Sequence, residues 1–382
     1  MEYKRKKSIT GWVLLLLLVV FAVASAGINL LLFRDAIFSN LDPESAQEAE
    51  VGALYSPYTN SSLDDIIAGQ TGRIPILEYH IINSPFVTSN YFMKHLLPDI
   101  RKIRRYVVDS DELRNQLDQL QKNGFRNISL DEYLSLAKGE KKELSRIPGN
   151  SKLYVLTFDD AGIGQFDFIG TNDIGEPEID PDCAVGVMID FAREHPDFKL
   201  NAAFCIQFSS TPFQDPKWVT KKLNMLLDLG FELVNHTVSH LPLAKVYRKD
   251  PKLVNYEIGH AMELFESHLG WRAASINKIC YPEGSISKEV EAMMSNVTWN
   301  GKTYHFEAAL DAIGPEAMNP NERKFDAYRI GRIETSRFSF TPFVLNAPNL
   351  YRTPPLLAKK TNDSGLHDWS PIQASLLPGP PR

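Results

Sequence analysis

The sequence predicts an α/β domain built on a mainly parallel sheet and preceded by one membrane-spanning helix. Strand-like and helix-like patterns alternate along most of the chain, which is typical of a parallel sheet covered by helices. The balance of 43% hydrophobic and 23% charged residues is that of a globular protein. The net charge of -6 gives no basic face, so we expect no nucleic-acid partner. Cys183, Cys205 and Cys280 are too few and too scattered for a disulfide scaffold or a paired zinc motif.

The N-terminal segment reads as a signal anchor. Residues 1–10 carry a basic cluster, and an apolar run follows over residues 11–33. About 20 apolar residues suffice to cross a bilayer as a helix. The basic segment should stay in the cytoplasm, which places the rest of the chain outside the cell membrane. The alternative is a signal peptide cleaved near Ala26, because the residues before it resemble a cleavage site.

Two further segments flank the expected domain. Residues 34–72 are acidic and then rich in small polar residues, which indicates a solvated linker. Residues 342–382 hold eight of the 24 prolines, so this tail cannot form long helices. The folded domain is therefore expected over residues 73–341. The sequence does not indicate an oligomeric state.

The strands and helices are expected in alternation inside these limits. A leucine pattern at helical spacing predicts a helix over residues 111–123, with Gly124 placed to end it. A second helix opens at Asp215-Pro216 and is stopped by Gly230, and a third covers residues 251–269 with proline in its first turn. Short β-rich runs predict strands at residues 74–79, 154–158, 200–206, 231–234 and 276–281.

Polar residues follow three of these strands where each one stops. They are Asp159 with Asp160, His236 with His240, and the pair Tyr281-Pro282. In parallel α/β folds the carboxyl ends of the strands meet on one face, where function collects. One carboxylate and two imidazoles are a recurrent site for a divalent metal ion. The spacing of four between the histidines would place both rings on one side of a helical turn. Of the two adjacent aspartates, one can bind the metal while its neighbour stays free to take a proton.

At this point the motifs resemble those of a known family, the polysaccharide deacetylases with a NodB homology domain (carbohydrate esterase family 4). Residues 157–160 look like the first family motif and residues 236–240 like the second. Residues 280–284 resemble the third motif in its Tyr-Pro-x-Gly form, and residues 75–80 resemble the Tyr-His strand of one branch of the family. The resemblance extends over about residues 73 to 340.

The resemblance implies a distorted (β/α)7 barrel that removes N-acetyl groups, less often O-acetyl groups, from a polysaccharide. Asp160, His236 and His240 would bind one divalent metal ion, with Zn²⁺ preferred over Co²⁺, Mn²⁺ or Ni²⁺. Asp159 would be the general base. The oxyanion would be stabilised by the metal and by a backbone N–H near Glu283, within the segment Tyr281-Pro282-Glu283.

The sequence also departs from the family pattern. Cys280 stands where the third motif usually has an arginine that holds the base. Lys278 and Arg332 are possible substitutes, and we favour Arg332 because residues 328–333 look like the arginine-bearing strand near the end of the family domain. For the general acid, His80 at the end of the first strand is preferred over His367 in the tail, although His80 could also simply line the site. Residues 162–182 are expected to be an inserted loop over the active-site face.

Two hypotheses follow from the motifs and from these departures. The first is a membrane-anchored, metal-dependent deacetylase of a cell-envelope or matrix glycan, such as peptidoglycan, a chitin-like oligomer or poly-N-acetylglucosamine. The alternative is a catalytically degenerate domain that binds glycan without turnover, which the altered third motif favours. A different metal-dependent amidohydrolase is a third and more distant possibility.

Overall fold

The computed structural model describes residues 72–83, 106–136, 147–148, 150–312 and 317–353. All of them belong to the compact unit Leu54–Arg382, which is distinct from the unit Met1–Ala53. The predicted membrane helix 11–33, nearly all of the linker 34–72 and the tail beyond Thr353 lie outside the described residues. Within the described ranges, no helix has the length and apolar character needed to span a membrane.

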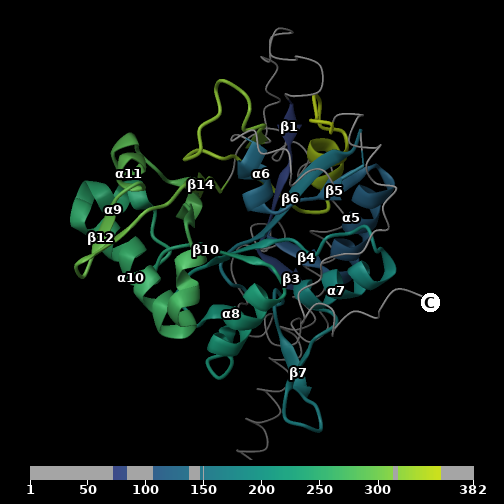
Figure 1. Ribbon diagram of the computed structural model, residues 1–382, viewed down its shortest axis with the longest axis horizontal. Coiled ribbons are helices and arrows are strands. Elements are labelled where there is room, and N and C mark those ends of the chain that lie inside the picture. Colours follow the sequence, from purple (N-terminus) through teal and green to yellow (C-terminus); the bar gives the residue numbers. More distant parts are fainter. Residues whose placement is uncertain (1–71, 84–105, 137–146, 149, 313–316, 354–382) are drawn as a thin grey trace, which may run out of the picture. The chain divides into compact units, whose positions relative to one another are not determined.

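A curled parallel sheet of eight strands forms the centre of the domain (Figure 1). Its strands follow the order β14-β11-β10-β9-β6-β2-β16, and β5 also pairs with β6. Every pairing in this sheet is parallel, as the alternation of strands and helices predicts. The strands are β2 (Ile76–Tyr79), β5 (Phe125–Asn127), β6 (Lys152–Phe158), β9 (Ala203–Ile206), β10 (Glu232–Asn235), β11 (Lys278–Cys280), β14 (Ala308–Leu310) and β16 (Ile333–Glu334).

One chain segment contacts both outer parts of this sheet. Ile330 forms a parallel bridge with Leu310 of β14, and its N–H donates to the carbonyl of Ala309. Three residues later, Ile333 of β16 pairs with Leu77 of β2. Arg332 lies between these two contacts, so it sits where the two ends of the curled sheet approach each other.

Small and branched side chains fill the inside of the sheet. Ala203, Cys205, Val234 and Ala308 are fully buried in one hydrophobic cluster with Cys280. Small side chains on adjacent strands let the sheet curl around a narrow core, because close-packed interiors leave little empty space.

The helices flank the sheet and begin where the sequence places capping residues. Asp250 accepts a hydrogen bond from the N–H of Lys252 at the start of α10, whose bounds match the predicted 251–269. Ser129 and Glu132 form a capping box at the start of α6. The helices are α5 (Ser110–Lys122), α6 (Leu130–Ser135), α7 (Ala184–Glu194), α8 (Val219–Asp228), α9 (Leu243–Lys249), α10 (Pro251–Leu269) and α11 (Lys288–Met293).

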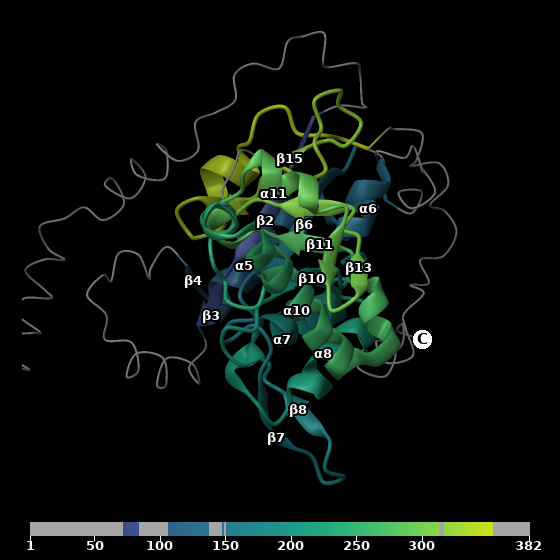
Figure 2. The same ribbon diagram turned by 90° about the vertical axis from the view of Figure 1, so that its left-hand side faces the viewer.

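The segment 162–182 after β6 contains a β-hairpin. Its strands β7 (Phe168–Thr171) and β8 (Pro177–Ile179) pair antiparallel, and the hairpin projects from the rest of the domain in Figure 2. The sequence predicts an insertion here but gives no sign of its strands. Three other small two-stranded sheets pair β1 (Arg73–Ile74) with β15 (Ala317–Met318), β3 (Ile81–Asn83) with β4 (Val107–Asp109), and β12 (Val297–Trp299) with β13 (Lys302–Tyr304).

The first part of the expected tail is attached to the domain. The N–H of Tyr351 donates to the carbonyl of Arg73, and the N–H of Thr353 donates to the carbonyl of Ser151. A short π-helix covers Thr341–Leu345. This part of the tail therefore packs against the domain through its backbone, and such pairing does not depend on helix-forming residues.

Candidate active site

The carboxyl ends of four sheet strands bring the predicted polar residues together. Asp159 and Asp160 follow β6, His236 follows β10, and His80 follows β2. Cys280 is the last residue of β11. Because these strands are parallel, their carboxyl ends lie on one side of the sheet, and the side chains converge there.

The guanidinium of Arg332 binds both oxygens of the Asp159 carboxylate. Its Nη1 lies 2.6 Å from Oδ1 and its Nη2 lies 2.7 Å from Oδ2, which is a bidentate pair. Nη1 also donates to the hydroxyl of Thr157, and Nε donates to the carbonyl of Asp311. The Arg332 side chain is 0% exposed, so the pair is shielded from water and salt. The direct pairing expected from the sequence is present in the structure, whereas the role of Arg332 in turnover stays a prediction.

Lys278, the other possible substitute, lies at the opposite end of β11. It pairs with Asp131, with Glu232 at 3.3 Å and with Glu307 at 3.7 Å. It therefore stabilises the amino-terminal side of the sheet rather than the site.

The charge of Arg332 determines the protonation state of Asp159. Burial alone would raise the pKa of Asp159, but the Arg332 guanidinium outweighs it and holds this pKa well below its usual range. Asp159 is therefore an ionised carboxylate at neutral pH, ready to accept a proton.

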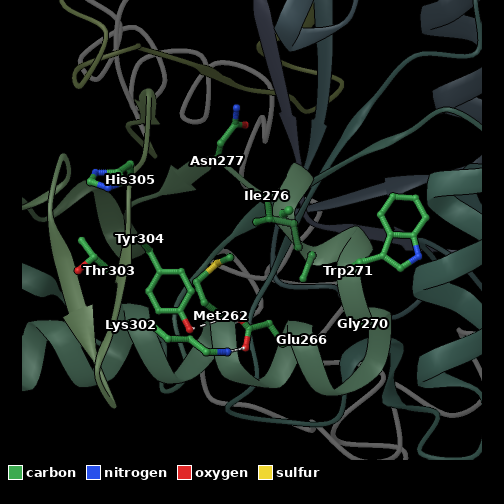
Figure 3. Close-up of a pocket in the computed structure, with 12 residues that line it drawn as sticks. Met262, Glu266, Gly270, Trp271, Ile276, Asn277, Lys302, Thr303, Tyr304 and His305 are labelled. Carbon is green, nitrogen blue, oxygen red and sulfur yellow. Dashed lines mark hydrogen bonds and ion pairs between the residues drawn. The ribbon is translucent and has the colours of Figure 1, made fainter.

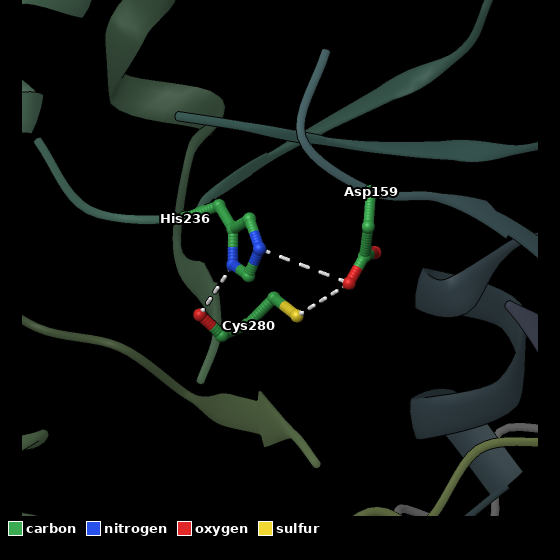
Figure 4. A group of neighbouring side chains, drawn as sticks. All are labelled: Asp159, His236 and Cys280. Atoms are coloured by element: carbon green, nitrogen blue, oxygen red, sulfur yellow. Dashed lines mark hydrogen bonds and ion pairs between the residues drawn. The ribbon is translucent and has the colours of Figure 1, made fainter. Parts of the chain in front are cut away.

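Cys280 contacts the same carboxylate as a neutral thiol (Figure 4). Its Sγ lies 3.4 Å from Oδ2 of Asp159 and 2.9 Å from Nη2 of Arg332. Burial raises the pKa of Cys280 well above its usual value, so the thiol keeps its proton and can donate to Asp159. Cys280 thus adds a weak hydrogen bond beside the Asp159–Arg332 pair but supplies no positive charge.

Asp160, His236 and His240 form a cluster whose atoms fit one metal ion. Oδ1 of Asp160 lies 3.5 Å from Nε2 of His236 and 3.3 Å from Nε2 of His240. Two ligands on a tetrahedral zinc are separated by about 3.3 Å when each bond is about 2.0 Å. In the described part of the chain, Oδ1 of Asp160 and Nε2 of His236 are buried without a hydrogen-bond partner. A shared cation would satisfy both atoms.

The orientation of the two histidine rings agrees with a ligand role. Nδ1 of His236 lies 2.9 Å from the carbonyl oxygen of Cys280, which can only accept, so Nδ1 carries the hydrogen (Figure 4). This leaves Nε2 directed at Asp160, an arrangement common among metal-binding histidines. Burial lowers the pKa of His240, which favours the neutral ring that a metal requires.

The predicted helical turn between the two histidines is absent. Thr237 and His240 have φ values of 67° and 52°, so this segment is a loop. The hydroxyl of Thr237 accepts from the N–H of His240, and Glu257 of α10 accepts from the N–H of Ser239. The rings still meet, with centroids 4.8 Å apart, because the loop turns back on itself.

A buried glutamine missed by the sequence reasoning supports the turn after β6. Asp160 and Ala161 have φ values of 73° and 47°, a conformation that non-glycine residues rarely adopt. The Gln165 side chain is fully buried, and its Nε2 lies 2.5 Å from the carbonyl oxygens of both Asp159 and His80. A glutamine in a loop carries no sequence signal, so this support could not be expected from the sequence.

Glu78 is a second residue that the sequence reasoning missed. It lies two positions before His80 on β2 and is 1% exposed. Its Oε1 lies 3.2 Å from Nη2 of Arg332 and 3.6 Å from Nε2 of His80. The structure thus places His80 beside the Asp159–Arg332 pair, with Glu78 between them.

Within the described residues, no hydrogen bond or ion pair joins the side chains of Tyr281 and Glu283 to this cluster. The N–H of Tyr281 already donates to the carbonyl of Leu310, so it is not available to an oxyanion. Pro282–Gly284 form a short turn in which Glu283 has a φ of 56°. The roles of Tyr281, Pro282 and Glu283 in binding substrate stay predictions.

A separate pocket of about 550 Å³ contains none of the site residues (Figure 3). It lies between the end of α10 and the hairpin β12–β13. Its carboxylate, Glu266, is already paired with Lys302 and accepts from the hydroxyl of Tyr304 at 3.3 Å. This pocket therefore offers no free carboxylate comparable to Asp159.

Comparison with known proteins found deacetylases among solved structures only. No protein-family model matches the chain, and no curated protein matches it significantly. The deacetylase PplD of Streptococcus pyogenes is 18% identical with a TM-score of 0.44, covering 69% of this chain and 92% of its own. A polysaccharide deacetylase from Bacillus cereus is 16% identical with a TM-score of 0.47, covering 72% and 69%. A de-N-acetylase from Aggregatibacter actinomycetemcomitans is 14% identical with a TM-score of 0.46, covering 71% and 100%. With TM-scores below 0.5, these likenesses carry none of the conclusions below, which rest on the side chains of the site.

Proposed function

We propose that the chain is a metal-dependent deacetylase that removes N-acetyl groups, less readily O-acetyl groups, from a cell-envelope or matrix polysaccharide. The observation that carries this proposal is a buried, ionised Asp159 locked by Arg332 beside three converging metal-type ligands. A base next to a Lewis acid is the arrangement needed to activate water for attack on an acetyl carbonyl. The four motifs that resemble polysaccharide deacetylases support the choice of substrate, and with it the distorted (β/α)7 barrel.

Asp160, His236 and His240 would hold the metal ion, for which we propose Zn²⁺. Such an ion lowers the pKa of a water molecule towards about 7 and polarises a carbonyl group. Asp159 takes the proton from the attacking water. Arg332 keeps the Asp159 carboxylate ionised and prevents it from turning towards the cation. An acid must then protonate the departing amine.

The Asp159–Arg332 pair also bears on the alternative of a degenerate, glycan-binding domain. Cys280 favoured that alternative, because the arginine expected at its position is missing. Arg332 supplies the same positive charge from another part of the chain, at 2.6 Å from Asp159. This contact supports turnover over binding alone.

We further propose that the domain is held at the outer face of the cell membrane by residues 11–33. The basic cluster before this apolar run supports that orientation. Cleavage near Ala26 would instead release the domain from the membrane.

Metal content and acetate release together test this proposal. The protein is to be assayed after removal of metal and after reloading with Zn²⁺, Co²⁺, Mn²⁺ or Ni²⁺. Peptidoglycan, N-acetylglucosamine oligomers and poly-N-acetylglucosamine are the substrate panel. We expect one bound ion per chain and metal-dependent acetate release from at least one glycan. Metal binding without acetate release from any of them would favour the glycan-binding alternative.

A further inference from the structure

Glu78 is a buried carboxyl group that the mechanism above does not use. It is 1% exposed, whereas the side chain of its neighbour His80 is 17% exposed. Glu78 therefore cannot reach a substrate directly, but His80 can. Any effect of Glu78 on the reaction must pass through His80, Arg332 or the neighbouring Asp159.

Two buried carboxyl groups share one guanidinium beside His80. Arg332 contacts the carboxyl groups of both Asp159 and Glu78. Asp159 takes both of the short contacts, and Glu78 has only the longer one, at 3.2 Å. A poorly paired buried charge is disfavoured, which favours a proton on the Glu78–His80 pair.

The surroundings of Glu78 favour its protonated form. Burial raises the pKa of Glu78 well above its usual value, Arg332 opposes this, and Asp159 and Glu334 add to it. Oε2 of Glu78 and Nδ1 of His80 are buried and have no hydrogen-bond partner in the described ranges.

His80 is fixed in place by contacts beyond Glu78. Its ring packs edge-on against Tyr106 at 4.8 Å between centroids, and its carbonyl accepts from Gln165. Asp159, Asp160 and His240 are charged or titratable groups whose fields also reach it.

We infer that Glu78 and His80 hold the proton that the departing amine takes up, which rests on the proposed function. His80 is the catalytic residue that delivers the proton, and Glu78 is the positioning residue that fixes the ring at 3.6 Å. As the C–N bond breaks, its electron pair stays on nitrogen and the proton moves from His80 to that nitrogen. The products are the free amine and acetic acid. Asp159 and acetic acid release their protons to solvent, and the pair takes one proton back from solvent.

A second metal ion is the competing interpretation of the same residues. Ligand atoms of Glu78, His80 and Asp159 all lie within 4.8 Å of one another. However, Nη1 and Nη2 of Arg332 already contact both carboxyl groups, at 2.6 to 3.2 Å. A cation placed there would face the guanidinium, so we assign a proton to this site and not a metal.

Paired substrates with different leaving groups test the inference. One is the N-acetylated glycan oligomer that the wild-type enzyme cleaves, whose amine must be protonated to leave. The other is 4-nitrophenyl acetate, whose nitrophenolate leaves without a proton. For Glu78→Gln and His80→Asn we expect turnover of the oligomer to fall about 10²-fold, the lower end of what a general acid contributes. Turnover of the ester should stay within about 3-fold of wild type, since it needs no acid.

Controls separate this result from a structural defect or a wrong function. Glu132→Gln removes a buried carboxyl that pairs with Lys199 away from the site, and it should leave the oligomer-to-ester ratio unchanged. Asp159→Asn should lose both activities. The double variant of Glu78 and His80 should be no slower on the oligomer than His80→Asn alone, because both changes remove one shared proton.

Three results would overturn the inference while leaving the deacetylase proposal intact. The first is an equal fall in turnover of both substrates in Glu78→Gln. The second is a double variant whose loss of oligomer turnover is the product of the two single losses. The third is a wild-type protein that binds two metal ions and a Glu78 or His80 variant that binds one. A metal-loaded wild-type protein without activity on either substrate would overturn the proposed function, and the inference with it. Thermal unfolding and metal content are measured on every variant, so that a failure to fold is recognised.

Discussion

At the scale of single residues, Arg332 supplies beside Asp159 the positive charge that Cys280 cannot supply. Cys280 is neutral, and Arg332 brings a guanidinium to the same carboxylate from the segment that joins the ends of the sheet. A guanidinium can reach Asp159 from any neighbouring strand, because only the final geometry of the pair matters for its charge. The position of a catalytic side chain is thus fixed in space rather than in sequence.

His236 and Asp159 should respond differently to substitution, because only His236 is expected to bind the metal. His236→Ala leaves two ligands and should lose metal and activity together. Asp159→Asn keeps the shape of the site but removes the base, so metal stays and turnover falls about 10² to 10⁴-fold. Atomic absorption and acetate release measure the two effects. Equal metal loss in both variants would show that Asp159 shares in ligation.

Arg332→Met should move the acidic limb of the pH–rate profile to higher pH. Arg332 holds the pKa of Asp159 well below its usual range against the effect of burial. Without it that pKa rises, so the base becomes protonated, and activity is lost, at a higher pH than in wild type. Metal content should not change.

Arg329→Met is the matched control for this variant. Arg329 lies three positions earlier and is half-buried, and it pairs with Glu291 instead of Asp159. The acidic limb of the pH–rate profile of Arg329→Met should match that of the wild type. If Arg332→Met left the limb in place, Arg332 would be a structural residue.

At the scale of elements, helix α8 stabilises two loops next to the catalytic aspartates. Its Lys222 is 1% exposed and lies 3.7 Å from Asp167 at the base of the β7–β8 hairpin and 3.2 Å from Asp215. The ammonium also lies over the ring of Phe213, whose N–H donates to the carbonyl of Ala161. One buried cation thus connects the hairpin with the turn that follows Asp160.

Lys222→Met should lower the free energy of unfolding by about 3 kcal/mol, because it leaves a buried carboxylate without its partner. The difference in free energy of unfolding between Lys222→Met and the wild type should become smaller as the pH falls. Burial already raises the pKa of Asp167, which Lys222 partly offsets, and a protonated carboxyl group needs no cation. Urea unfolding at neutral and at mildly acidic pH measures both effects.

The neighbouring Lys221→Met is the control for charge removal on the same helix. Lys221 pairs with Glu176 in an exposed position, and such pairs contribute at most about 1 kcal/mol. A similar loss of stability in both variants would contradict a special role for Lys222.

The sequence is informative wherever local chemistry determines an element. The parallel sheet, helix α10 and the polar residues at strand ends could be predicted, because each depends on periodicity, a cap or a strand boundary. The turn at residues 236–240 could not, since a spacing of four between histidines also occurs in loops. Glu78 and Gln165 act through contacts with distant segments, and neither lies in a pattern that sets it apart from an ordinary strand or loop residue.

At the scale of the whole chain, the proposed substrate and the N-terminal segment each lead to an expectation for the side of the membrane on which the domain lies. The substrate proposed for the site is a cell-envelope or matrix polysaccharide, which lies outside the cell membrane. The basic residues before the apolar run favour the same side for the domain. Both considerations support the proposal that residues after Gly72 lie outside the membrane.

A protease added to intact cells should therefore digest the domain while the protein fractionates with membranes. An antibody against a tag at the N-terminus should detect a short, protected fragment, since the basic segment and residues 11–33 would be shielded by the bilayer. Replacing Lys4, Arg5, Lys6 and Lys7 with acidic residues should weaken this orientation, because positive charge keeps the flanking segment in the cytoplasm. Recovery from the medium of a shortened chain that begins near Gly27 would show instead that the segment is a cleaved signal peptide. A domain that resists the protease until the cells are lysed would place it inside, where the proposed glycan is absent, and would count against both the topology and the substrate.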